Sequence, residues 1–114
     1  MPPGDAPDGL VANMTDIGRL HEALVARALD GDGEAARPLR RAAYDLHGLD
    51  DPLRTLVEKT AYHAYMVTDD DIASIRSSGL TEDQIFEIVV CAAIGQATRQ
   101  YESGLKALRA VAAD

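Results

Sequence analysis

The apolar run IFEIVVCAAIG, at positions 85–95, constrains the fold more than any other stretch of the chain. Glu87 is its only charged residue, so a helix through it has apolar side chains nearly all round. Just before the run, Thr81 and Gln84 have the spacing of a capping box. These signals predict a long helix over about 82–112, whose first half is buried on several sides by other helices.

Helical periodicity accounts for the rest of the chain as well. Strand signals are absent, because no β-branched residues alternate with polar ones and no Asn-Gly turn occurs. Gly48 is expected to cap the end of the second helix. Pro38 lies in the first turn of that helix, so a beginning at Arg37 is also compatible with the sequence. Asp51 is expected to be the N-cap of the third helix, with Pro52 at its first position. The expected helices before the last one span about 10–30, 34–47, 52–66 and 68–79.

These elements predict an all-α fold of about five helices in one domain, residues 10–114. Residues 1–9 hold three of the five prolines and are expected to form a disordered leader. A net charge of −8 and a pI near 4.7 argue against nucleic acid as a partner. The basic stretch RPLRR, residues 37–41, is interpreted as a solvated helix face. Neither a signal peptide nor an apolar run of membrane-spanning length is evident, so a cytoplasmic protein is expected.

The stretch DDDIASIRSSGLTEDQIFEIVVCAAIGQATRQYESGLKALR resembles the C-terminal helices of the carboxymuconolactone decarboxylase and alkylhydroperoxidase AhpD-like families. There, a helix ending in small residues and glycine precedes Leu-Ser/Thr-x-x-x-Ile, which opens a long apolar helix. Ile75–Gly79, Leu80, Thr81 and Ile85 follow this pattern, and the similarity extends back to about Leu53. The resemblance implies an AhpD-like helical array that forms homo-oligomers, trimers or hexamers, or pairs with a related subunit.

The sequence departs from these families at their redox site. Active AhpD-like members carry Cys-x-x-Cys followed by a histidine, and the corresponding positions here lie near Ala64, Val67 and Asp71. Peroxide reduction by that route needs one thiolate to attack and a second to resolve the product. The chain has a single cysteine, Cys91, which is expected to be buried with a raised thiol pKa. Thiol peroxidase activity is therefore not expected, and neither a cofactor nor a metal is predicted.

Asp69, Asp70 and Asp71 allow two interpretations. Their carboxylates could bind a divalent cation, or they could occupy the first turn of a helix beginning after Thr68, where negative charge is stabilised by the helix dipole. The second interpretation is favoured because no glycine-centred calcium loop accompanies them.

His63 is the sharpest candidate for chemistry, because histidine titrates near neutrality and lies where the resemblance places the site. The leading hypothesis is a non-redox oligomeric subunit, or a partner of an active relative, with a degenerate site. The alternative is a cysteine-independent decarboxylase or lactone-handling enzyme with His63 as general acid/base, assisted by Tyr62 or Glu58. Decarboxylase-type relatives are the precedent for this alternative, because they use histidine and carboxylate without the cysteine pair. A purely structural His63, or a helical interaction module without a small-molecule pocket, also remains open.

Overall fold

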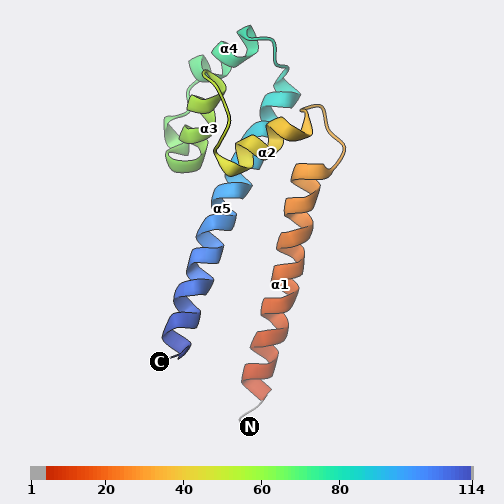
Figure 1. The fold of residues 1–114 in the computed structure, drawn as a ribbon, viewed down its shortest axis with the longest axis vertical. Coiled ribbons are helices and arrows are strands. Elements are labelled where there is room, and N and C mark those ends of the chain that lie inside the picture. The colour runs from red at the N-terminus through yellow and green to blue at the C-terminus, as the bar shows by residue number, and fades with distance from the viewer. Residues whose placement is uncertain (1–4, 114) are drawn as a thin grey trace.

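A computed structural model describes the backbone of residues 5–113 and the side chains of residues 16–113. Every regular element in this range is helical, as the sequence predicts (Figure 1). A single 3₁₀ turn, Ala64–Met66, follows the third helix. The five α-helices are α1 (Asp5–Asp30), α2 (Arg37–Asp45), α3 (Leu53–Tyr62), α4 (Asp69–Ser77) and α5 (Glu82–Ala113).

The first three helices differ from expectation at their ends. Helix α1 begins at Asp5, so it includes part of the expected leader, whose residues 1–4 lie outside the described range. Helix α2 ends earlier than predicted, and its C-cap is Leu46 in the left-handed region (φ 55°) instead of Gly48. Pro52, not Asp51, is the N-cap of α3, and the Asp51 carboxylate accepts a hydrogen bond from the Thr55 hydroxyl at 2.7 Å.

The capping box predicted at the start of α5 is confirmed, and a second box forms at the start of α4, where only the N-cap Thr68 was predicted. At α4, the Thr68 hydroxyl accepts from the Asp71 amide, and the Asp71 carboxylate accepts from the Thr68 amide. At α5, the Thr81 amide donates to Gln84 Oε1 at 2.9 Å, and the Gln84 amide donates to the Thr81 hydroxyl at 3.1 Å. Each box satisfies two amide groups that a helix start otherwise leaves unpaired.

Helix α5 is the central element of the core and packs against the other four helices. Its closest approach is to α2 at Gly95, where an added Cβ would overlap the backbone of Tyr44. Arg99 Nη1 fixes the same contact by donating to the Tyr44 carbonyl at 2.7 Å. The core residues are almost all aliphatic; the largest that are fully buried are Leu56, Val57, Ile75, Ile88 and Cys91. The expected burial of the first half of α5 on several sides holds only in part, since Phe86 is 69% exposed.

The molecule consists of a compact head and a projecting arm (Figure 1). The head contains α2, α3, α4 and the adjoining ends of α1 and α5. The arm, residues 5–24 of α1 and 98–113 of α5, is an antiparallel helix pair that carries both termini to one end. The principal extents are 62 × 29 × 22 Å. In the described range, no helix combines the length and the apolar character that a membrane crossing demands.

Candidate functional site

The three residues proposed for acid–base chemistry lie at the C-terminal end of α3. Glu58 and Tyr62 are exposed on successive turns, and His63 follows as the C-cap of the helix. The His63 ring meets the Tyr65 ring edge to face, with 6.0 Å between centroids. Glu58 lines a shallow pocket between α2 and α3, which neither Tyr62 nor His63 lines. The geometry thus does not converge on a shared cavity, and the catalytic role of His63 stays a prediction.

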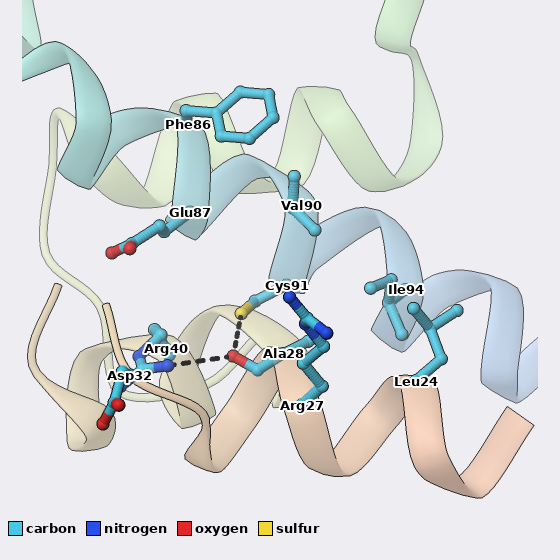
Figure 2. A pocket seen from close by; sticks show the side chains of 10 residues that line it. All are labelled: Leu24, Arg27, Ala28, Asp32, Arg40, Phe86, Glu87, Val90, Cys91 and Ile94. Carbon is cyan, nitrogen blue, oxygen red and sulfur yellow. Dashed lines mark hydrogen bonds between the residues drawn. The ribbon is translucent and has the colours of Figure 1, made fainter. Parts of the chain in front are cut away.

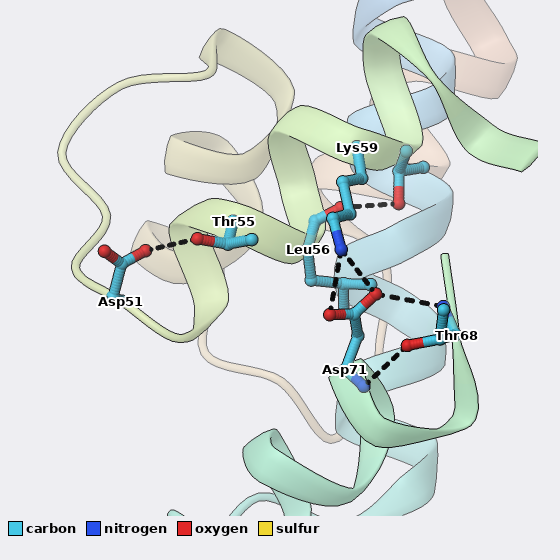
Figure 3. A network of polar contacts seen from close by, with 7 residues as sticks. Asp51, Thr55, Leu56, Lys59, Thr68 and Asp71 are labelled. Carbon is cyan, nitrogen blue, oxygen red and sulfur yellow. Dashed lines mark hydrogen bonds and ion pairs between the residues drawn. The ribbon is translucent and has the colours of Figure 1, made fainter. Parts of the chain in front are cut away.

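The aspartate cluster is part of the start of α4 (Figure 3). Asp69 and Asp70 are exposed in the first helical turn, while Asp71 also bonds to Lys59 of α3. The Thr68 amide and, after it, the Lys59 ammonium hold the pKa of Asp71 below its ordinary value. Within residues 16–113, no three His, Cys, Asp or Glu side chains gather as a metal site would require. The helix-start interpretation is the one that this geometry supports.

Cys91 is buried, as the sequence predicts, with 1% of its surface exposed. Its thiol lies 3.4 Å from the carbonyl oxygen of Ala28 on α1. Burial raises the pKa of the Cys91 thiol, so the thiol stays protonated near neutral pH. A protonated, enclosed sulfur is a poor nucleophile.

A pocket of about 210 Å³ opens where α1, α2 and α5 meet (Figure 2). Its walls are mainly apolar. Phe86, Val90 and Ile94 lie on successive turns of α5, and Leu24 faces them from α1. Cys91 and Ala28 form part of the floor. None of the sequence-predicted catalytic residues lines this pocket.

Arg40 at the inner end of the pocket contradicts the prediction for the RPLRR stretch. Its side chain is 4% exposed rather than solvated. Nη1 donates to the carbonyl oxygens of Ala28 at 3.2 Å and Gly31 at 2.8 Å, groups left unpaired at the end of α1. Nε is buried without a hydrogen-bond partner. Sequence reasoning missed Arg40, although its three-residue spacing from the small, buried Ala43 places both on one face of α2.

Glu87 binds backbone amides of the connection between α1 and α2, whereas Arg40 binds backbone carbonyls at its start. Its carboxylate oxygens accept hydrogen bonds from the amides of Glu34 and Ala35. The Ala35 amide is the main reason that the pKa of Glu87 is lowered. A Cβ at Gly33 would overlap this carboxylate, which explains the glycine there. The isolated acid in an otherwise apolar run was the available sequence signal, because such a charge needs a local partner.

Comparisons with known proteins identify no relative of this chain. The chain matches no protein-family model, and neither a curated protein nor a solved structure matches it. Inferences about function therefore depend on the geometry of the residues themselves.

Proposed function

We propose that this protein is a non-redox, AhpD-like cytoplasmic subunit that works as a homo-oligomer, assembled through the exposed apolar rows of its two long helices. One observation carries the proposal: large apolar side chains lie exposed in rows on both arm helices. Ile17, Leu20 and Leu24 recur at helical spacing on α1 and are 53%, 71% and 51% exposed. On α5, Leu108 and Val111 are 57% and 73% exposed.

The row on α5 continues beyond the arm. At 100° per residue, Phe86, Val90, Leu108 and Val111 fall within one side of the helix. Ala93, Ala97 and Gly104 occupy the same side between them and are exposed. Small side chains between larger ones let a second helix approach closely, so this side is shaped for helix packing.

The exposed area is large enough for a stable interface. The accessible surface is 7824 Å². A compact monomer of 12.2 kDa is expected to expose about 6,100 Å², so the extended shape leaves about 1,700 Å² in excess. A stable interface needs about 800 Å² from each partner.

A second copy of the chain is the occupant that the charges favour. Residues 99–109 of α5 contain three basic side chains and one acidic one, Glu102. Residues 16–22 of α1 contain one basic side chain, Arg19, and two acidic ones, Asp16 and Glu22. Opposite charges on α1 and α5 are satisfied in a two-fold dimer that packs each α1 against the α5 of its partner. The product is a four-helix bundle with an apolar interior.

Light scattering coupled to size-exclusion chromatography tests this proposal. The wild-type chain is expected to elute as a multimer at micromolar concentrations. Leu20→Glu combined with Val111→Glu is expected to shift it to a monomer, because each charge would be buried in the bundle. Ala26→Glu is the matched control, since Ala26 is exposed on α1 but points away from the row. A wild-type monomer at high concentration, or equal effects of the two substitutions, would contradict the assembly.

A further inference from the structure

The pocket beside Cys91 carries two guanidinium groups that have no part in the proposed oligomerisation. Its apolar walls end at a buried guanidinium, Arg40. A second guanidinium, Arg27, rises from α1 toward α5 and lines the same pocket (Figure 2). Within the described residues, the Arg27 side chain makes no hydrogen bond and no ion pair.

The hydrogen-bonding capacity of Arg40 is only partly used. A guanidinium has five N–H groups. Nη1 donates to two backbone carbonyls, while Nε and Nη2 donate to no acceptor among the described residues. A buried cation is costly unless it is paired and hydrogen-bonded. The unfilled positions of Arg40 therefore favour an anionic acceptor from outside the chain.

Two carboxylates also line the pocket and must be considered. Those of Glu87 are engaged by the amides of Glu34 and Ala35 and point toward the connecting loop, away from Cys91 (Figure 2). Asp32 is exposed at the edge. Neither forms an ion pair with Arg40 or Arg27 within residues 16–113. Glu87 attracts Arg40 from a distance, but it leaves the open N–H groups without an acceptor.

We propose that this pocket binds a small monocarboxylic acid with an unbranched or aromatic apolar tail. The carboxylate accepts from Nη2 of Arg40, since Nε is fully buried, and Arg27 adds a second positive charge. The tail lies along Phe86, Val90 and Ile94, opposite Leu24. A volume of about 210 Å³ limits the ligand to a small acid, since pockets for drug-sized ligands are about 300–1,000 Å³. Its apolar wall shares Leu24, Phe86 and Val90 with the rows proposed for assembly, whereas its guanidinium end is not part of those rows.

Isothermal titration of the whole chain with octanoate, octanol and octylamine tests the proposal. The three probes share a tail and differ only in the head group. Octanoate is expected to bind at least ten-fold more tightly than either of the others, and to shift the Arg40 Nε–H resonance in the NMR spectrum. Equal binding of octanol would assign the site to apolar contact alone, and tighter binding of octylamine would assign it to Asp32 and Glu87. Either result, or no octanoate binding below millimolar concentration, would overturn the proposal.

Substitutions in the pocket test whether its side chains bind the ligand or only stabilise the fold. Arg27 is exposed, so Arg27→Gln should fold normally and weaken octanoate binding by about three- to ten-fold, with octanol binding unchanged. Ile94→Trp should block all three probes by filling the pocket. Arg41→Gln is the matched control, because Arg41 pairs with Asp45 on the surface of α2 and does not line the pocket. If Arg27→Gln weakened octanoate and octanol equally, the charge would have no part in recognition.

The arm variants distinguish this proposal from the proposed assembly. Leu20→Glu with Val111→Glu should abolish the multimer and retain octanoate binding, since neither residue lines the pocket. Failure of assembly with intact binding would contradict only the oligomer. Loss of octanoate binding in the monomeric variant would show that the anion site needs the second copy, which contradicts the single-chain site proposed here.

Discussion

The Lys59 ammonium donates to both carboxylate oxygens of Asp71, at 3.1 and 3.0 Å, and so joins α3 to the first turn of α4 (Figure 3). The same carboxylate closes the capping box with Thr68. A region that the sequence suggested as a reactive centre is thus held by an ion pair and a helix cap. Its charges stabilise the junction between two helices.

Removal of the cap should destabilise the protein measurably. Thr68→Ala deletes the hydroxyl that accepts from the Asp71 amide, and such N-cap losses cost about 1 kcal/mol. Ser74→Ala, at an exposed position inside α4, should change stability by less than about 0.5 kcal/mol. Urea unfolding followed by circular dichroism measures both. Equal effects at the two positions would show that the cap does not contribute.

Two glycines of α5 should respond in opposite directions to the same substitution. Gly95→Ala places a methyl group against the Tyr44 backbone and should destabilise the chain by about 1–3 kcal/mol. Within one chain, Gly104→Ala meets open space, so on the monomeric Leu20→Glu, Val111→Glu background it should stabilise the helix by about 0.5–1 kcal/mol. Thermal and urea unfolding compare each variant with its parent chain. A neutral Gly95→Ala would contradict the close approach of α2 to α5.

The Glu87 carboxylate should make stability depend on acid pH. Its pKa is lowered in the folded chain from an ordinary value of 4.5, mainly by the Ala35 amide. The stabilisation is therefore present above about pH 4.5 and is lost as the pH falls through the lower, folded value. Glu87→Gln should flatten this part of the stability profile, whereas Glu102→Gln, at an exposed position, should not. Urea midpoints at pH 7, 5 and 3.5 measure the slope.

Cys91 should be unreactive until the chain unfolds. Its thiol pKa is raised by burial, so labelling by a disulfide reagent at neutral pH should be slow in the native protein and rapid in urea. Peroxidase assays with a dithiol donor should remain at background for wild type and Cys91→Ser alike. Fast native labelling, or wild-type peroxidase turnover that Cys91→Ser abolishes, would refute the exclusion of thiol redox chemistry.

Sequence reasoning succeeded where the determining interactions are local. The box at Thr81 connects residues three positions apart, so its spacing alone identifies it, and the N-cap Thr68 is identified by the acidic residues that follow it. The burial of Cys91 follows from its apolar neighbours on one helix. These features are encoded within a few turns of chain and do not require knowledge of the tertiary arrangement.

The incorrect predictions concern positions whose structure depends on backbone groups or side chains from other elements. Arg40 is buried because the carbonyls of Ala28 and Gly31 end a helix beside it, which no property of RPLRR reveals. Leu46 takes the left-handed cap, and Gly48 comes two residues too late to do so. The pocket itself combines side chains from α1, α2 and α5, whose separation in sequence hides it. The geometry around His63 was likewise beyond the reach of spacing arguments.

Arg40 and Glu87 hold the short connection between α1 and α2 from opposite sides, one through its carbonyls and the other through its amides. These contacts hold α1, a helix of 26 residues and about 39 Å, at its C-terminal end, which would be the pivot for any tilt of the helix. A tilt of about 5° at that pivot would move the far end by about 3 Å, close to the rise of two helical residues. In the proposed assembly, one substitution there would change the distance between α1 and the α5 of the partner copy while every residue along their contacting sides stayed the same.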